Sequence, residues 1–165
     1  MKIIKFQMGE QRLCIISSSN EELLEYIEID ELNITNYSPI TGSYVILECN
    51  NQILLGFNTW RKQWELPSGG IEEGETLREC AKRELYEETC QDVNLEDLVF
   101  KGLVKIFHKQ KNEIRFRGVF YSKTNSISSF TKNYEISSIM MWSPKDKMKN
   151  YDVVDFEIIN RFREN

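Results

Sequence analysis

Glutamates gather around Arg83 in the stretch of the chain that begins at Gly69. Five residues separate Gly69 from Glu75, seven more precede Arg83, and the run from 83 to 88 reads RELYEE. A glycine-rich turn that leads into clustered glutamates suits a hard divalent cation, because Mg²⁺ is bound by a few carboxylates together with water and phosphate oxygens. The spacing therefore predicts a site at which a metal ion meets a phosphorylated ligand.

The segment from Thr76 to Thr89 is expected to form an α-helix, since it contains no Gly or Pro and is rich in good helix formers. At about 100° per residue, one stripe of this helix is apolar. Glu84 and Glu88 fall inside the stripe, and Glu87 lies at its edge. The apolar members of the stripe are Leu77, Cys80, Ala81 and Leu85.

A solvent-exposed helix with ion pairs one turn apart would explain part of this pattern. It accounts for Glu79 and for a pair between Arg83 and Glu87. It does not account for Glu84 and Glu88, because two like charges among core-facing residues repel each other and lose hydration, which is costly unless a cation or hydrogen bonds compensate. The pattern therefore favours a bound divalent metal.

These residues resemble the signature of the Nudix hydrolases, the MutT-like family, which reads G-x5-E-x7-R-E-U-x-E-E-x-G-U with U a bulky aliphatic residue. The stretch Trp64–Pro67 is similar to the family's lead-in to this signature. The motif covers about a seventh of the chain. The positions that match in register are Gly69, Glu75, Arg83, Glu84, Leu85, Glu87 and Glu88.

The chain departs from the signature at the end of the helix. Cys90 stands where the family has Gly, and Gln91 stands where it has an aliphatic residue. A non-glycine residue in the left-handed conformation costs about 1 kcal/mol, so Cys90 is expected to end the helix in another way. Val93 is expected to supply the buried apolar contact.

The resemblance implies a metal site built from this helix. Glu84, Glu87 and Glu88 would ligate Mg²⁺ or Mn²⁺, and one of them, with Glu84 the first candidate, would instead orient or deprotonate the attacking water. Arg83 would hold the glutamate side chains in place through bidentate contacts.

Further metal contacts are implied outside the helix. Glu75 would be an outer metal contact, and the carbonyl of Ser68 or Gly69 a further ligand. Nudix enzymes often add a carboxylate from a later loop, for which Glu135 is the candidate here; the alternative is an ordinary exposed loop glutamate.

Three arginines are candidates for binding the substrate. Arg115 and Arg117 are two apart in an expected strand, so they project from one face and suit a diphosphate. Arg61 lies in the loop before Trp64 and is a further candidate phosphate contact. Solvent-facing charges that keep the chain soluble explain the same residues equally simply. Candidate base-stacking residues, which are also plain core residues, are Phe57, Trp64 and Tyr44.

Composition sets the class of protein. A chain of 165 residues with 41% hydrophobic content is expected to form a single domain over residues 1–165. The net charge of −5 argues against binding to duplex DNA but not against binding one nucleotide through metal ions. Four cysteines without the spacing of a zinc site, and no long apolar run, predict a cytoplasmic protein with reduced thiols and no membrane segment. The single histidine, His108, argues against a nucleophile activated by histidine.

Hydrophobic patterning predicts an α/β fold, an α/β/α sandwich of the Nudix type with a mixed central sheet. Residues 1–40 would form an N-terminal extension, with a hairpin over 1–18 that is a candidate homodimer contact and a segment over 21–40 that suits a short helix or a strand. The expected elements after it are strands at 42–47, 53–57, 98–107, 114–122 and 138–142, the helix at 76–89 and a closing helix at 153–162. A turn at Asn50-Asn51 is expected to join the first two strands into an antiparallel hairpin. The residues of the closing helix expected to face inward are Val154, Ile158, Ile159 and Phe162.

The residues and the resemblance together predict Mg²⁺-dependent hydrolysis of the diphosphate linkage in a nucleoside diphosphate derivative. A nucleotide sensor of the same fold without hydrolytic activity, a prenyl diphosphate isomerase of related fold, and a purely structural acidic helix are the alternatives. The substrate remains open among an oxidised nucleoside triphosphate, a dinucleotide, a nucleotide sugar and a capped RNA end.

Overall fold

The computed structural model describes residues 15–18 and 20–164. The hairpin expected over residues 1–18 therefore lies almost wholly outside the described residues. The described strands belong to one mixed sheet, in which β3 and β8 run parallel and the other pairs are antiparallel. The path through the sheet is β1-β2-β7-β8-β3-β4-β5, with β6 paired to β3 and β9 paired to β4.

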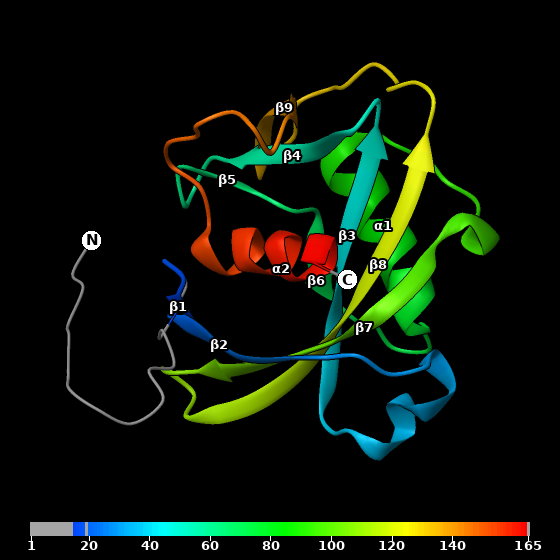
Figure 1. Ribbon diagram of the computed structural model, residues 1–165, viewed down its shortest axis with the longest axis vertical. Helices are drawn as coiled ribbons and strands as arrows, with labels where there is room; N and C mark the ends of the chain where they lie inside the picture. The colour runs from blue at the N-terminus through cyan, green and yellow to red at the C-terminus, as the bar shows by residue number, and fades with distance from the viewer. Residues whose placement is uncertain (1–14, 19, 165) are drawn as a thin grey trace.

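The elements follow the expected order (Figure 1). The strands are β1 (Ile15–Ile16), β2 (Glu21–Ile27), β3 (Ile40–Cys49), β4 (Gln52–Asn58), β5 (Gln63–Glu65), β6 (Ser68–Gly70), β7 (Val99–His108), β8 (Glu113–Thr124) and β9 (Ile136–Trp142). The helices are α1 (Leu77–Thr89) and α2 (Val153–Glu164), with short 3-10 turns η1 (Glu31–Asn36) and η2 (Leu95–Asp97). The segment 21–40, which suited either a helix or a strand, contains the strand β2 and the turn η1.

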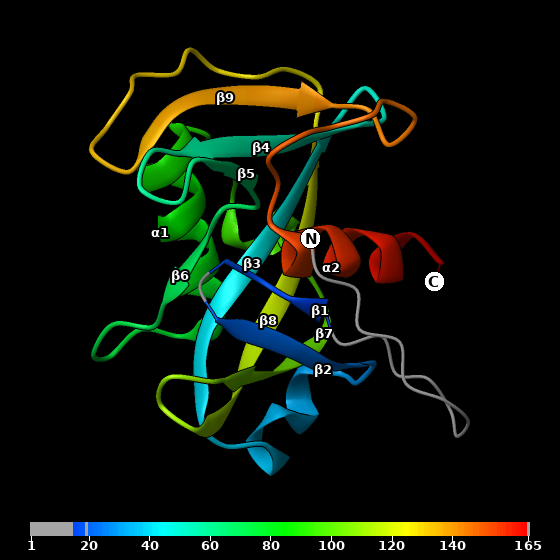
Figure 2. The same ribbon diagram turned by 90° about the vertical axis from the view of Figure 1, so that its left-hand side faces the viewer.

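Two helices cover opposite sides of the central strands, as Figure 2 shows for β3 and β8. Alternate residues of β3 face the two layers: Val45 and Leu47 pack on the α1 side, and Tyr44 and Ile46 on the α2 side. This is the period of two that a strand buried on both faces requires. The predicted α/β/α sandwich with a mixed sheet is confirmed.

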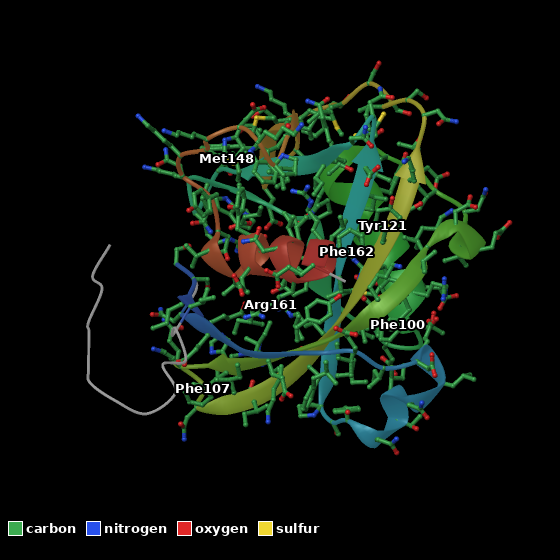
Figure 3. The ribbon with its side chains drawn as sticks, in the orientation of Figure 1. Phe100, Phe107, Tyr121, Met148, Arg161 and Phe162 are labelled. Atoms are coloured by element: carbon green, nitrogen blue, oxygen red, sulfur yellow. The ribbon has the colours of Figure 1, made fainter. Side chains whose placement is uncertain are left out.

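The layer under α2 is closed by aromatic contacts. Phe162 of α2 stacks on Tyr121 of β8, with ring centroids 4.9 Å apart (Figure 3). Val154, Ile158 and Ile159 of α2 are fully buried, as expected for the inward face of a closing helix.

Backbone conformation explains the turn before β4. Asn50 and Asn51 both have positive φ, of 52° and 61°. Consecutive positive φ values are typical of the tight turns that join antiparallel strands, and asparagine tolerates them well. The predicted hairpin of β3 and β4 is confirmed.

The helix α1 begins and ends with local hydrogen bonds. Thr76 and Glu79 form a reciprocal capping box at its start. At its end, Cys90 adopts the left-handed conformation with φ of 59°, and its N–H donates to the Tyr86 carbonyl. The expectation that Cys90 would end the helix differently is therefore wrong, because the chain keeps the glycine-like geometry despite the side chain.

Gln91 replaces an aliphatic contact with a set of hydrogen bonds. Its buried amide accepts a hydrogen bond from the Ser128 N–H at 2.7 Å, and donates to the carbonyls of Ser128 and Thr89. Val93 packs against the α1-side core, as expected. The loop before β9 is thereby tied to the end of α1.

Among the described residues, no helix is long and apolar enough to cross a membrane.

Candidate functional site

Arg83 ties the glutamates of the helix to the turn before it. Its Nε and one terminal nitrogen donate to the two carboxylate oxygens of Glu75, at 2.8 and 2.9 Å. The other terminal nitrogen donates to Glu84 at 2.7 Å and to Glu87 at 3.2 Å. A further bond reaches the Gly70 carbonyl at 2.8 Å. Charge-assisted bonds of this kind fix both distance and orientation, so Arg83 sets the position of Glu84.

Gly69 makes room for the Glu84 carboxylate. A Cβ at Gly69 would lie 2.0 Å from the Glu84 Oε1. Gly42 on the paired strand β3 is equally constrained, because a Cβ there would lie 2.1 Å from the Gly69 carbonyl oxygen. Glycine at position 69 therefore allows the Glu84 carboxylate to lie against β6, and glycine at position 42 allows the Gly69 carbonyl to lie against β3.

Glu84 and Glu88 are withdrawn from solvent, as their places on the helix predicted. The Glu84 side chain is 13% exposed, and Glu88 is 8% exposed. Burial raises the pKa of Glu84, although the hydrogen bond from Arg83 lowers it. Burial raises the pKa of Glu88 still further, in spite of the hydrogen bond that its carboxylate accepts from the Ser68 N–H at 3.0 Å. Burial therefore disfavours the ionised form of both carboxylates, and a positive charge nearby favours it. Arg83 supplies such a charge to Glu84.

The two carboxylates line a cavity of about 370 Å³ between α1, β6, β8 and the start of α2. Its wall also includes the backbone of Ser68, Gly69 and Gly70. Only Arg61 and Arg117 supply positive side chains among its described lining residues. Seven acids face them: Glu21, Glu65, Glu84, Glu88, Glu135, Asp152 and Asp155. Such an excess of acids in a confined space attracts cations and disfavours a bare anion.

Arg61 and Glu135 lie in the cavity wall but are bound to each other and to neighbours. Arg61 forms a bidentate pair with Glu65 at 2.7 and 2.8 Å, and a bond of 3.2 Å to Glu135. Glu135 also accepts from the Asn58 amide at 3.0 Å. These bonds hold the loop before β9 against the turn between β4 and β5, and they place Glu135 close enough to raise the pKa of Glu88.

Two aspartates at the start of α2 complete the wall. The backbone of Asp152 donates to the Trp64 carbonyl at 2.9 Å, which fastens this segment to β5. Asp152 accepts hydrogen bonds from the first N–H groups of the helix and from the Gln63 amide. Asp155 accepts from the Leu66 N–H at 2.7 Å. Burial, followed by the charges of Asp152 and Glu65, raises the pKa of Asp155 well above its ordinary value.

Four of the sequence-predicted site residues are not among the residues that line this cavity, and Arg83 is one of them. Glu75 faces a separate, open depression on the outer side of α1 and is held by Arg83, whose hydrogen bonds lower the pKa of Glu75. The Glu87 side chain is 58% exposed at the edge of the helix. Arg115 pairs with Glu113 on β8 and is not among the cavity-lining residues. The structure thus brings together Gly69, Glu84, Glu88, Glu135, Arg61 and Arg117, and leaves Arg115 apart.

Glu21, Glu65, Asp152 and Asp155 line the cavity, although sequence reasoning did not select them. Asp152 lies directly before a helix, where an aspartate is ordinarily read as a cap. Glu65 directly follows Trp64 in the lead-in to the signature, and this position is a weak indication that Glu65 belongs to the site. Nothing in the local sequence links Glu21 to residues so distant along the chain.

The donors present fit a divalent cation. Mg²⁺ and Mn²⁺ accept carboxylate and carbonyl oxygens, and Mg²⁺ keeps several waters and phosphate oxygens as ligands. Glu84, Glu88 and the carbonyl at Gly69 supply such oxygens, and no described cation pairs with Glu88. Within the described chain no three acidic, histidine or cysteine side chains already converge on one point, so water and phosphate would complete any coordination shell.

Comparison with known proteins identifies a matching family and a curated relative. The family model described as NUDIX domain matches residues 38–162. An RNA pyrophosphohydrolase of Psychromonas ingrahamii is 41% identical over 59 residues, which are 34% of this chain and 31% of that protein. This chain thus spans about a third of the length of that curated relative.

Two solved structures share the fold. The Bacillus subtilis pyrophosphohydrolase BsRppH, solved as a mutant, matches with a TM-score of 0.70 and 15% identity, over 92% of this chain and 93% of that one. A bifunctional NMN adenylyltransferase/ADP ribose pyrophosphatase from Francisella tularensis, complexed with AMP and an Mn ion, matches with a TM-score of 0.60 and 20% identity, over 78% of this chain and 42% of that one.

Proposed function

Because this chain belongs to the NUDIX domain family, we propose that it is a divalent-metal-dependent pyrophosphohydrolase that cleaves the diphosphate linkage of a nucleotide derivative. The observation that carries the proposal is the placement of Glu84 and Glu88, two shielded carboxylates with raised pKa values, in a cavity rich in acids. A purely structural helix gives no reason to bury them together.

Each residue of the site has a proposed task. Glu88 and the Gly69 carbonyl would hold Mg²⁺ or Mn²⁺, with Glu87 and Glu135 as further ligands, and Glu84 would act on the attacking water. Arg83 orients Glu84, and Glu75 anchors Arg83 from the other side. When bound, the metal would neutralise phosphate charge and acidify a water molecule.

Glu84 is the proposed acceptor of the proton from the attacking water. Burial raises the pKa of this carboxyl, which makes it a stronger base than an exposed glutamate. Arg83 donates a hydrogen bond to one carboxylate oxygen of Glu84 and so fixes its orientation. The other oxygen remains available to accept the proton. No covalent intermediate with the protein is needed, because water attacks the phosphorus directly.

The substrate is proposed to be a small nucleotide derivative or a nucleotide at an RNA end. The similar proteins include an RNA pyrophosphohydrolase and an ADP ribose pyrophosphatase, so RNA ends and ADP-ribose should both be among the first substrates tested. The three described cysteines are free thiols, which agrees with the proposed cytoplasmic setting.

Hydrolysis of nucleoside triphosphates, ADP-ribose and 5′-triphosphorylated RNA, with Mg²⁺ or Mn²⁺, tests the proposal. Glu84→Gln and Glu88→Gln should each lower metal-dependent turnover by about a hundredfold or more. Glu79→Gln is the matched control, because Glu79 lies on the exposed side of the same helix and Gln also supports a capping box. Full activity in both cavity variants would overturn the assignment, and tight nucleotide binding without any turnover would identify a sensor instead.

A further inference from the structure

Glu21 reaches the cavity from outside the part of the chain that the family model matches. It lies on β2, ahead of residue 38 where the match begins, and is 9% exposed. β2 pairs with β7, and Glu21 lies opposite His108. The described part of the N-terminal extension therefore supplies a side chain to the site.

Arg117, the partner of Glu21, is incompletely bonded. Its terminal nitrogens lie 3.7 Å from the Glu21 carboxylate and 3.4 Å from the Tyr44 hydroxyl, both long contacts. Its guanidinium lies over the Tyr44 ring, 5.4 Å from the centroid. Its Nε is buried and has no hydrogen-bond partner among the described residues. An unmet buried donor is unfavourable. The two terminal nitrogens, whose contacts are long, are the donors of Arg117 that a ligand in the cavity could use.

The surroundings of Arg117 disfavour a phosphate group there. The carboxylates of Glu21 and Asp155 both act on the charge of Arg117, and Asp152 acts on the adjoining Tyr44 hydroxyl. An anion would meet these acids as well as the guanidinium. A neutral group that offers an acceptor to Arg117 and a donor to a carboxylate meets no such repulsion, and the edge of a nucleobase is such a group.

The groups around Arg117 come from other elements than the carboxylates proposed to act with the metal. Arg117, Tyr44 and Glu21 come from β8, β3 and β2, whereas Glu84 and Glu88 come from α1. A nucleotide can reach both sets of groups, with its diphosphate at the metal and its base, several bonds away, at Arg117.

We propose that Arg117 and Glu21 bind the nucleobase of the substrate, and that Glu21 determines which base is preferred. This inference rests on the proposed function for the identity of the ligand. Glu21 offers only acceptors to the base, and Arg117 offers only donors, so the pair distinguishes bases by the order of donors and acceptors along their edges.

Steady-state kinetics on four nucleoside triphosphates that differ only in base test the proposal. Glu21→Gln replaces an acceptor-only carboxylate by an amide, and should change the ratio of kcat/KM between the best and worst base by about tenfold or more, through KM. Glu22→Gln is the matched control, because it removes an ion pair of the same strand, to Lys109, away from the cavity. Arg117→Lys keeps the charge but replaces the planar pair of terminal donors by a single nitrogen, and should lose the same base preference.

Calorimetric binding of the four uncharged nucleosides, without metal, separates this inference from the proposed activity. Nucleoside binding whose base preference is altered in Glu21→Gln, without hydrolysis of any nucleotide, would refute the activity alone. An equal loss of kcat/KM for all four bases, with a lowered melting temperature, would show a structural role for Glu21 and overturn the inference. Unchanged base ratios in both Glu21→Gln and Arg117→Lys would overturn it as well.

Discussion

Replacing Gly69 by alanine should displace the Glu84 carboxylate while leaving the fold nearly as stable as before. The added Cβ would lie 2.0 Å from Glu84 Oε1 and 2.1 Å from its Cδ. The nearest obstacle is the end of a flexible side chain, not backbone, so the carboxylate can move and the fold can persist. Gly69 also has no positive φ that would strain an alanine.

The size of the movement follows from the contact distances. Ordinary contacts begin at 3.4 Å, so the Glu84 carboxylate must retreat by about 1.4 Å, the difference between 3.4 and 2.0 Å. Displacement by about 1 Å from a productive geometry costs about a hundredfold in rate. A side chain forced out of its rotamer costs about 0.5–1.5 kcal/mol in stability. We therefore expect a large loss of turnover with a small loss of stability.

The assay compares Gly69→Ala with Gly70→Ala. A Cβ at Gly70 would meet only the Thr41 carbonyl oxygen, at 3.6 Å, which is an ordinary contact. Metal-dependent hydrolysis and urea unfolding are measured for both variants and for the unaltered protein. Gly70→Ala should keep turnover within a few-fold of the unaltered protein.

Turnover of Gly69→Ala within threefold of the unaltered protein would refute the reasoning, since Glu84 would then be displaced without consequence. A loss of stability equal to a core cavity, about 3 kcal/mol or more, would also refute it. In that case the glycine would serve the fold rather than the site.

Three further predictions concern stability, each measured by urea unfolding. Cys90→Gly should stabilise the protein by about 1 kcal/mol, because glycine adopts the left-handed conformation at no steric cost; a destabilised variant would contradict this. Gln91→Leu should destabilise by about 1–3 kcal/mol, because the Ser128 N–H loses its acceptor; unchanged stability would show that water replaces the amide. Asp155→Asn should stabilise by about 1 kcal/mol at neutral pH and keep an acceptor for the Leu66 N–H. Since the folded pKa of Asp155 is raised, the unaltered protein loses stability as pH rises from about 4, so the advantage of Asp155→Asn should vanish below that pH.

Patterns that are local in the chain could be predicted from the sequence. The helix of the signature, the asparagine turn before β4 and the inward face of α2 all depend on residues close together in sequence. The burial of Glu84 and Glu88 followed from helical periodicity alone.

Features that depend on contacts between distant segments could not be predicted. Strand alternation predicted that Arg115 and Arg117 act together, but only Arg117 lines the cavity, because segments far apart in the sequence form its walls. Glu21 reaches the cavity only through the pairing of β2 with β7. The left-handed Cys90 was missed for another reason: a strain of about 1 kcal/mol is readily offset when neighbouring contacts, here those of Gln91, fix the end of the helix.

A titration with Mn²⁺, followed by the loss of the electron paramagnetic resonance signal of the free ion, tests the central claim most directly. The unaltered protein and Glu79→Gln should bind Mn²⁺ with similar affinity, and Glu88→Gln should bind at least about tenfold more weakly, because one buried carboxylate ligand is lost. Equal Mn²⁺ affinity in the unaltered protein and in Glu88→Gln would contradict the claim that this buried carboxylate holds the metal.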